Sequence, residues 1–514
     1  MIDLFDLIAD REPDRACLKD GSVVLSYGEV QLRTIRLANA LLGQGFPPET
    51  KAAIYSDNSH LAMEALLGIL RAGGTWVSFN MRHSAADNAR FLASCDLEVL
   101  FVQDRYRTDV EMIRAICPKL RLVIGLDGSG AEAVPLDTFV AGAPDVEPDV
   151  PADEGALATI FSTGGTTGTP KGAMWTHLTW QTLVANFWSS LPSDKSPVHL
   201  LISPMSHAAG VIGLALFARG ATQVILPGFD ANAILDAIGR ERVTHLFLPP
   251  TAIYSLLAAP GVNECDFTSL EYFVYAAAPM SATKLREAIE VFGPVMAQTF
   301  GQAEAPMLCT CMTPADHVAG LTEEPSRLES CGRPTLLTRV AIIDDEGRSM
   351  PTGVVGEVAV SGTLVMAGYY RDEEATAQTR RNGWHATGDV GFMDQAGFVH
   401  LVSRKRDLII SGGFNVYPGE VEQVLWSHPA IKDCAVIGIP HEKWGEAVHA
   451  VVELKPNHAS PSDRELIALC KQRLGSVRAP KSIEIWDSLP RSPVGKVLKT
   501  EIRARYWQGR DRQI

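Results

Sequence analysis

Short apolar runs alternate with amphipathic stretches through the first 400 residues of this 514-residue chain. The runs are rich in Val, Ile and Leu and are bounded by polar residues, which is typical of buried strands. The longer stretches between them carry apolar residues at helical spacing. This alternation predicts an α/β fold in which helices cover mostly parallel sheets. The predicted strands lie at residues 52–55, 99–102, 122–124, 156–160, 224–226 and 245–248.

The pattern changes twice in the second half of the chain. Between residues 340 and 400, short strands separated by glycine turns replace the helical spacing, which predicts a small β-barrel or sheet. A charged run at 403–407 then precedes a final segment that is long enough for an α+β lid. We therefore expect a hinge near residues 403–407.

Composition narrows the class of protein. The chain is 46% hydrophobic and 21% charged, as soluble globular proteins are, and its 514 residues are too many for one core. The first ten residues are acidic, unlike a secretory or transit signal. The longest apolar run, 208–218, is too short to cross a bilayer, so we expect no integral membrane association. Nine scattered cysteines indicate reduced thiols and a cytoplasmic location.

Charge is unevenly distributed along the chain. Residues 404–514 carry 18 Lys/Arg and 13 Asp/Glu, a balance of +5, whereas the rest of the chain has a balance of −19. A basic C-terminal module on an acidic body suits small anionic ligands, although it is equally a module with a basic face. No stripe of interleaved aromatic and basic residues is present, so nucleic acid is not expected as a partner.

The most informative segment is residues 161–172, Phe-Ser-Thr-Gly-Gly-Thr-Thr-Gly-Thr-Pro-Lys-Gly. Nine of its twelve residues are Gly, Ser or Thr, and it follows a predicted strand. Backbone N–H groups, hydroxyls and the Lys171 ammonium could together surround a polyphosphate. Pro170 before the lysine and Gly172 after it favour a hairpin loop over the helix start of a common P-loop. A surface linker is the alternative interpretation.

This segment resembles the phosphate-binding loop of the adenylate-forming superfamily, which includes acyl-CoA synthetases, aryl-CoA ligases, luciferases and peptide-synthetase adenylation domains. Further motifs follow in the family's order over roughly residues 20–500, and the chain most resembles acyl-CoA ligases of the fatty-acid type. The resemblance implies a multi-layer N-terminal domain over 1–403, with two α/β subdomains and a small β-barrel, and a mobile α+β C-terminal domain over 404–514. It also implies that the ATP phosphates contact Ser162, Thr163, Gly164, Thr166, Thr167 and Lys171.

Residues 298–304, Gln-Thr-Phe-Gly-Gln-Ala-Glu, resemble the family's second nucleotide motif. The resemblance implies nucleotide contacts for Gln298, Thr299 and Phe300. It makes Glu304 a catalytic residue that binds Mg²⁺, a hard cation that prefers oxygen ligands. Ala303 stands where the family has a threonine whose hydroxyl contacts the α-phosphate, so that contact is in doubt.

Two further segments resemble nucleotide-binding motifs. Residues 275–280 resemble the segment that lines adenine and the acyl group, with Ala276, Ala277 and Ala278 where glycines are common. Residues 384–389 resemble the family's Thr-Gly-Asp motif, in which the Asp389 carboxylate would accept hydrogen bonds from both ribose hydroxyls. Arg404 falls on the family's ribose-binding arginine. We assign no chemistry to the structural motifs at 356–358 and 368–370.

Residues 204–210, Pro-Met-Ser-His-Ala-Ala-Gly, resemble the family segment beside the substrate carboxylate. The resemblance implies that His207 gates the acyl site and acts in catalysis. Peptide-synthetase domains usually place an aspartate in this region, so an amino-acid substrate is disfavoured. Asp230 mimics that aspartate but precedes a helical run at 233–238, and we interpret it as an N-cap.

The C-terminal motifs concern the thiol and the adenylation step. Residues 409–422 resemble the family's signature after the hinge, in which Gly412 and Gly413 would let a pantetheine tail pass close to the backbone. Arg406 takes the hinge position. Residues 489–496 match the motif that carries the family's adenylation lysine, here Lys496, whose long cationic side chain could stabilise the transferring phosphorus.

These resemblances imply an ATP-dependent carboxylate–CoA ligase, with ATP, Mg²⁺ and coenzyme A as cofactors and a medium- or long-chain fatty acid as the expected substrate. An aryl-acid–CoA ligase and an enzyme that loads an acyl carrier protein are the main alternatives. A luciferase-like oxygenase and a non-catalytic nucleotide-binding relative, the latter raised by Ala303, are further ones. A homodimer is left open.

Overall fold

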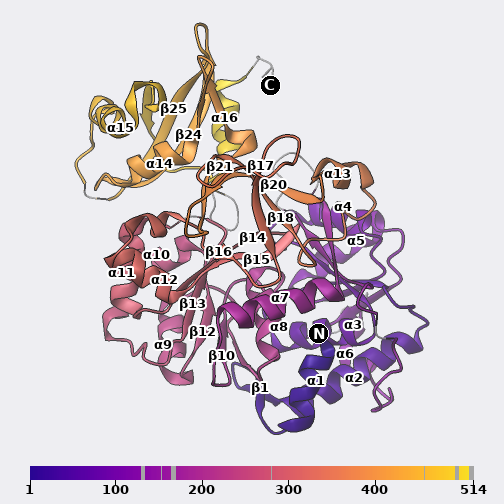
Figure 1. Ribbon diagram of the computed structural model, residues 1–514. Coiled ribbons are helices and arrows are strands. Elements are labelled where there is room, and N and C mark those ends of the chain that lie inside the picture. The colour runs from indigo at the N-terminus through magenta and orange to yellow at the C-terminus, as the bar shows by residue number, and fades with distance from the viewer. Residues whose placement is uncertain are drawn as a thin grey trace.

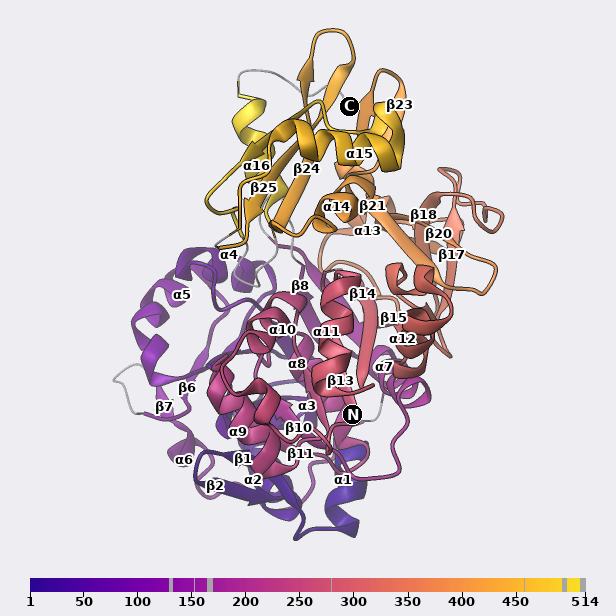
Figure 2. The ribbon, with the colours of Figure 1, turned by 90° about the vertical axis from the view of Figure 1, so that its left-hand side faces the viewer.

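A computed structural model describes residues 1–128, 133–151, 153–163, 170–278, 280–456, 458–491 and 497–508. Strands in this part of the chain pair into four sheets. Figure 1 shows two large α/β units side by side, a third group of strands above them, and a separate C-terminal unit at the top. The view turned by 90° in Figure 2 shows the same C-terminal unit standing above the rest of the chain.

The first large sheet has seven strands and is parallel except for its β8–β9 pair. Its predicted strands at 52–55, 99–102 and 122–124 are confirmed, and the run at 156–160 overlaps β8 with a shift at the ends. In spatial order the strands are β7 (Val134–Pro135), β6 (Leu122–Gly125), β5 (Val99–Val102), β3 (Lys51–Tyr55), β4 (Thr75–Ser78), β8 (Leu157–Ser162) and β9 (Gly172–Thr176).

The second large sheet has nine strands, with parallel strands at its centre and antiparallel pairs at its two edges. The predicted runs at 224–226 and 245–248 overlap β11 and β12. In spatial order the strands are β16 (Arg333–Pro334), β15 (Ala305–Met312), β14 (Met296–Gln302), β13 (Tyr272–Tyr275), β12 (His245–Phe247), β10 (Val198–Leu201), β11 (Thr222–Ile225), β1 (Ala16–Asp20) and β2 (Val23–Ser26).

Helices pack around the strands of the two large sheets (Figure 1), as the alternating sequence pattern predicted. Asp230 caps α9 by accepting a hydrogen bond from the Ala233 N–H at 2.8 Å, so its interpretation as an N-cap is confirmed. The helices are α1 (Ile2–Arg11), α2 (Tyr27–Gly43), α3 (His60–Arg71), α4 (Ala85–Ser94), α5 (Val110–Ile116), α6 (Leu136–Phe139), α7 (His177–Ser190), α8 (Ala208–Phe217), α9 (Ala231–Glu241), α10 (Pro250–Leu257), α11 (Ala282–Phe292), α12 (Pro314–Thr322), α13 (Glu373–Gln378), α14 (Pro418–Trp426), α15 (Asp463–Arg478) and α16 (Lys499–Tyr506).

One hydrophobic cluster joins the two large sheets. It includes Trp76 and Phe101 from the first sheet and Leu201 and Phe247 from the second. Helix α8 runs through this cluster, and all its residues from Ala209 to Phe217 are buried. A helix that is apolar on every side must be surrounded by protein or lipid, and here protein surrounds it.

The strands between residues 339 and 404 form a five-stranded antiparallel sheet. Of the two forms that the sequence pattern allowed, barrel or sheet, the described strands take the sheet. Its strands are β17 (Arg339–Ile343), β18 (Gly356–Ser361), β20 (Trp384–Met393) and β19 (Arg380–Arg381) in spatial order, with β21 (Val399–Arg404) also paired to β20.

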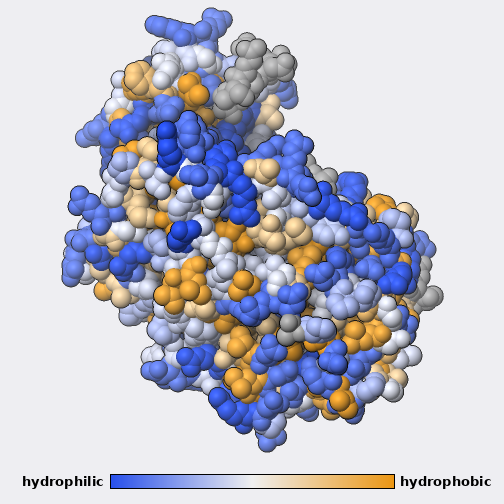
Figure 3. Space-filling model, turned by 45° about the vertical axis from the view of Figure 1, so that its right-hand side comes forward, coloured by the Kyte–Doolittle hydropathy of each residue, from blue (hydrophilic) through white to orange (hydrophobic). Residues whose placement is uncertain are grey.

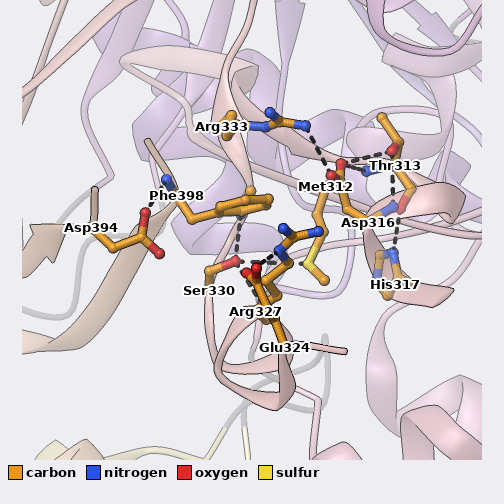
Figure 4. A network of polar contacts seen from close by, with 11 residues as sticks. Met312, Thr313, Asp316, His317, Glu324, Arg327, Ser330, Arg333, Asp394 and Phe398 are labelled. Atoms are coloured by element: carbon orange, nitrogen blue, oxygen red, sulfur yellow. Dashed lines mark hydrogen bonds and ion pairs between the residues drawn. The ribbon is translucent and has the colours of Figure 1, made fainter. Parts of the chain in front are cut away.

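A polar cluster ties this third sheet to the nine-stranded one (Figure 4). The buried ring of Phe398 lies between two guanidinium groups, 5.2 Å from that of Arg327 and 4.8 Å from that of Arg333. Arg333 also donates to Asp316 of α12 at 2.9 Å, and Asp316 accepts from Thr313 in the capping box of that helix. The Arg327 side chain is mostly buried, whereas that of Arg333 is half exposed. Cation–π contacts contribute about 0.5–1 kcal/mol at exposed sites and about 2 kcal/mol when desolvated, so Phe398 helps to hold this junction together.

The C-terminal unit has a five-stranded sheet with helices α14 and α15 packed against one hydrophobic cluster and α16 against another. These clusters draw their buried residues from the C-terminal unit alone. The strands are β23 (Phe414–Val416), β22 (Ile409–Ser411), β25 (Gly445–Leu454) and β24 (Ile431–His441) in spatial order, with β26 (Ser482–Ile485) paired to β25.

Figure 3 shows one face of the surface, where apolar residues occur in separate groups among polar and charged ones. Among the described helices, none has both the length and the apolar character needed to cross a membrane.

Acid should destabilise the fold through histidines that burial keeps neutral. Burial lowers the pKa of His245 to about 3 and those of His199, His317 and His385 to about 4. In the unfolded chain histidine takes up a proton near pH 6.5, so the free energy of unfolding should fall as pH drops below that value. Each group contributes about 1.4 kcal/mol per pH unit. Together these four histidines should contribute a slope of about 5 kcal/mol per pH unit between pH 6 and 5.

Urea denaturation at pH 7, 6 and 5 measures this slope. His245→Asn should reduce the slope of the free energy of unfolding against pH by about 1.4 kcal/mol per unit, the contribution of one histidine. Replacing the exposed His458 should leave this slope unchanged. A free energy of unfolding that is flat from pH 7 to 5 would contradict the expectation.

Candidate active site

The Gly/Ser/Thr loop begins and ends on an antiparallel hairpin. Ser162 on β8 pairs with Gly172 on β9. The Thr163 N–H donates to the Lys171 carbonyl at 2.8 Å, and the Lys171 N–H donates to the Thr163 hydroxyl at 3.1 Å. The hairpin form is therefore confirmed. Gly164, Thr166 and Thr167 lie outside the described residues.

Lys171 and Glu304 come together although they are far apart in the sequence. The Lys171 ammonium lies 3.4 Å from the Asp372 carboxylate and 5.2 Å from the centre of the Tyr369 ring. The Tyr369 hydroxyl donates to Glu304 Oε1 at 2.6 Å. Burial, followed by the Glu304 carboxylate, raises the pKa of Tyr369 well above its usual value, so this hydroxyl keeps its proton. Lys171 and Glu304 therefore both contact Tyr369.

Asp389 and Arg404 form the second polar group of the site. They are register partners on β20 and β21, and Arg404 Nε lies 2.6 Å from Asp389 Oδ1. Thr387 of the same motif donates its hydroxyl proton to the Val358 carbonyl and accepts from the Asp389 N–H. Gly388 between them has a φ of +74°, a conformation that suits glycine. This turn buries the carboxylate of Asp389 beside the cation.

The three alanines that were predicted to line adenine follow the end of β13. Ala277 has a φ of +75°, in the left-handed region that alanine rarely adopts. Next to them, Tyr275 pairs with Gln298 of β14, and the Tyr275 hydroxyl lies 3.2 Å from Gln298 Oε1 and 2.9 Å from His317 Nε2. Ala277 therefore has an unfavourable backbone conformation directly after β13, which is hydrogen-bonded to β14.

Ala277→Gly should stabilise the protein by about 1 kcal/mol, because glycine adopts this backbone conformation without strain. Ala276→Gly is the matched control. Position 276 has no left-handed backbone, so glycine there should destabilise by roughly 0.5–1 kcal/mol. Chemical denaturation of both variants measures the difference, and equal destabilisation by both would contradict the strain.

Thr299 and Phe300 point to opposite faces of β14, as consecutive strand residues do. The Thr299 side chain is 3% exposed, and its hydroxyl has no hydrogen-bond partner within the part of the chain that the structure describes. Continuing the β13–β14 register by one residue places Ala276 beside it. Phe300 packs against the core of the third sheet. A buried hydroxyl without a hydrogen-bond partner is costly.

His207 precedes α8 and contacts Phe161, the first residue of the 161–172 segment. Its ring makes an edge-to-face contact with Phe161 at 5.8 Å, and its Nδ1 lies 2.9 Å from the Ser206 hydroxyl. Burial, followed by the nearby His83 and Arg82, lowers the pKa of His207 to about 4. The imidazole is therefore neutral near pH 7, and it can gate or hydrogen-bond a substrate without adding charge.

Gly412 and Gly413 form the turn between β22 and β23, with φ values of +60° and +83°. The Gly412 N–H donates to the Trp444 carbonyl at 2.9 Å, and Phe414 beyond the turn is 61% exposed. Lys496 lies outside the described residues. Arg491 and Val497, the described residues on either side of its segment, form an isolated β-bridge. These two residues therefore lie side by side on the C-terminal unit.

Sequence reasoning missed Tyr369 and Asp372. Tyr369 lies in the motif Gly368-Tyr-Tyr, which was given no chemistry, and its ring lies beside Lys171. Asp372, two residues beyond that motif, places a carboxylate beside the same lysine. The Tyr369–Glu304 contact joins residues 65 positions apart, which no local pattern could reveal.

Comparisons with known proteins identify the family of this chain. A family model described as AMP-binding enzyme matches residues 5–370, and one described as AMP-binding enzyme C-terminal domain matches residues 420–496. The chain is 40% identical over 377 residues to the medium/long-chain-fatty-acid–CoA ligase FadD8 of Mycobacterium tuberculosis. That match covers 72% of this chain and 65%, less than two thirds, of the relative.

Two other similar proteins match almost end to end. The chain is 34% identical over 502 residues to a feruloyl-CoA synthase of Amycolatopsis sp, which covers 97% of both chains. Among solved structures, the amide bond synthetase McbA from Marinactinospora thermotolerans superposes with a TM-score of 0.89 at 30% identity, covering 98% of this chain and 99% of that one. The chain therefore belongs to the AMP-binding enzyme family, the adenylate-forming superfamily that its motifs resemble.

Proposed function

We propose that this protein is an AMP-forming carboxylate–CoA ligase that acts on a medium- or long-chain fatty acid. The observation that carries the proposal is the joining of Lys171 and Glu304 through Tyr369 at the end of the phosphate-loop hairpin. This arrangement puts a cation for phosphate and a carboxylate for a metal ion within one site. The similarity to FadD8 favours the fatty acid.

Two chemical steps follow from the proposal. The substrate carboxylate attacks the α-phosphorus of ATP, pyrophosphate leaves, and an acyl-adenylate forms. The thiol of coenzyme A then attacks the acyl carbonyl, AMP leaves, and a thioester forms. In the first step negative charge must be held by Lys171, by the hydroxyls and N–H groups of the hairpin, and by Lys496.

The nucleoside would be held by three groups of residues. The Asp389 carboxylate, oriented by Arg404, would accept from the ribose hydroxyls. Adenine would lie against the small side chains of 276–278 and the strand residues Gln298 to Phe300. Gly412 and Gly413 would let the pantetheine tail approach the backbone, and neutral His207 would close the acyl side of the site.

The residues present fit a magnesium ion bound with ATP. Mg²⁺ is usually held by one or two carboxylates together with substrate phosphates rather than by a protein cage. Glu304 offers one oriented carboxylate, and the described residues contain no group of three or more His, Cys, Asp or Glu that could hold a metal ion by themselves. The ion would neutralise phosphate charge.

We also propose a hinge at 403–407 between an N-terminal domain over 1–403 and a C-terminal domain over 404–514. Lys405 lies 2.7 Å from the Asp345 carboxylate and 3.0 Å from that of Glu357, both in the third sheet region. Asp407 instead lies 3.6 Å from Arg503 of α16. The side chains on either side of Arg406 therefore belong to different units, which supports Arg406 as the pivot.

An aryl acid is the second candidate substrate. The end-to-end similarity to a feruloyl-CoA synthase favours it. It would use the same nucleotide site as a fatty acid, so the two candidates differ only in how the acyl group is bound.

Ala303→Thr tests whether the missing threonine hydroxyl is compensated. The Ala303 carbonyl accepts from the Trp175 indole N–H at 2.6 Å, which fixes the backbone there, and the buried Thr299 hydroxyl has no hydrogen-bond partner among the described residues. We expect Ala303→Thr to change the adenylation rate by less than about tenfold. Thr299→Val should slow it by about tenfold or more, because a hydrogen bond to a charged group is worth about 1.5–3 kcal/mol. Pyrophosphate exchange measures both variants, and a large gain for Ala303→Thr would show an impaired wild-type site.

AMP release from a panel of aliphatic and aromatic acids, with and without CoA, tests the function. CoA-dependent AMP release with C8–C18 acids supports the proposal, and release with cinnamic-type acids alone supports the aryl candidate. AMP release that requires an acyl carrier protein instead of CoA would reject the ligase assignment, as would absence of AMP release with every acid.

A further inference from the structure

Tyr369 touches both charged residues of the proposed phosphate site. Its ring centre lies 5.2 Å from the Lys171 ammonium, and its hydroxyl donates to Glu304 Oε1 at 2.6 Å. The residue as a whole is 9% exposed. One aromatic residue therefore contacts the cation for the phosphates and the carboxylate for the metal.

Backbone hydrogen bonds fix Tyr369 relative to both of its partners. Residues on either side of it pair with the end of the hairpin: the Tyr370 N–H donates to the Gly172 carbonyl at 2.8 Å, and the Met174 N–H donates to the Gly368 carbonyl at 2.9 Å. Three residues before Tyr369, the Met366 N–H donates to the Glu304 carbonyl at 2.8 Å. The ring is thus held by main-chain contacts to both halves of the site.

The chemistry of these contacts orients the carboxylate and the ammonium. A protonated hydroxyl on one carboxylate oxygen fixes the rotation of that carboxylate, as outer donors do for metal ligands. The ring face attracts the ammonium, by about 0.5–1 kcal/mol at exposed sites. Asp372 also pairs with Lys171 at 3.4 Å, so the ring is one of two groups that place this cation.

We propose that Tyr369 is a positioning residue, which sets the Glu304 carboxylate for the magnesium ion of Mg·ATP through its hydroxyl and steadies Lys171 through its ring. The inference rests on the proposed function, because it requires that Mg·ATP binds at Lys171 and Glu304. It predicts that the hydroxyl matters only when magnesium is present, and that the ring matters in either case.

Calorimetric titration of ATP into the full-length protein, with Mg²⁺ and separately with EDTA, tests this prediction. Tyr369→Phe should weaken ATP binding at least tenfold in Mg²⁺ and by less than twofold in EDTA, since loss of outer-shell partners commonly costs about 10–100-fold in metal affinity. Tyr369→Leu, which also removes the ring, should weaken binding in EDTA as well.

Tyr370→Phe is the matched control. The Tyr370 hydroxyl donates to the Asp96 carboxylate at 3.0 Å, so this variant also loses a tyrosine–carboxylate hydrogen bond, but away from Lys171 and Glu304. Its ATP affinity should equal that of the wild type in both buffers. If Tyr370→Phe lost ATP affinity in Mg²⁺ but not in EDTA, and by as much as Tyr369→Phe, the assignment to Tyr369 would be overturned.

A double-mutant cycle tests whether Tyr369→Phe weakens ATP binding through Glu304 or through a general defect of the protein. In a Glu304→Gln background, adding Tyr369→Phe should cause no further loss of affinity in Mg²⁺. An equal loss in both backgrounds would overturn the positioning role, as would wild-type affinity of Tyr369→Phe in Mg²⁺. If the wild-type protein itself fails to bind Mg·ATP, the proposed function falls and this inference falls with it, which is a distinct result.

Discussion

Lys496→Ala should abolish acyl-adenylate formation and spare thioester formation from acyl-adenylate that is supplied to the protein. In the proposed mechanism the Lys496 ammonium stabilises charge on the transferring phosphorus and the attacking carboxylate. Removing one preorganised charge-stabilising group costs about 10²–10³ in rate, so pyrophosphate exchange should fall by at least that factor. The second step no longer involves phosphoryl transfer, so it should stay within a fewfold of wild type.

The two half-reactions are measured by pyrophosphate exchange and by CoA consumption with synthetic acyl-adenylate. Lys471→Ala, an exposed lysine on α15 of the same unit, is the control and should leave both rates unchanged. Equal losses in both half-reactions would contradict the assignment of Lys496 to adenylation alone.

Arg406→Pro should slow one half-reaction about a hundredfold more than the other. Proline fixes φ near −65°, so it would hold the proposed hinge in a single conformation. The flanking side chains are already tied to different units, Lys405 to Glu357 and Asp407 to Arg503. In the proposed hinge, rotation between the units would therefore occur near residue 406.

Arg406→Ala separates the loss of the guanidinium from the loss of rotation, and it should impair both half-reactions far less than proline does. The same two assays apply. If the proline variant keeps both rates near wild type, the pivot lies elsewhere in the chain.

Local patterns predicted the elements of this fold better than their pairing. Residues 99–102 form a buried strand because four apolar residues in a row fit the middle of a parallel sheet. The hairpin around the phosphate loop followed from Pro170 and Gly172. By contrast, β1 at the start of the chain pairs with β11, about two hundred residues later, and no local signal specifies such a partner.

In the candidate site, too, local motifs predicted residues better than they predicted contacts between distant segments. Asp389 and Arg404 were predicted together because a motif and its spacing carry both, and the antiparallel pair β20–β21 makes them register partners. Tyr369 was missed because its two contacts depend on how residues 368–370 lie across the hairpin. The left-handed backbone of Ala277 was also missed, because an alanine gives no sequence signal for a conformation that is usual for glycine.

The shared cluster around α8 has a consequence for recombination between relatives. Side chains of both large sheets pack into one cluster around α8. If one of these sheets came from a relative, its side chains would have to fit the buried surfaces of the other sheet and of α8. The C-terminal unit keeps its apolar side chains in clusters of its own. Exchanging this unit at the charged junction should therefore yield folded hybrids, whereas exchanging one large sheet should not.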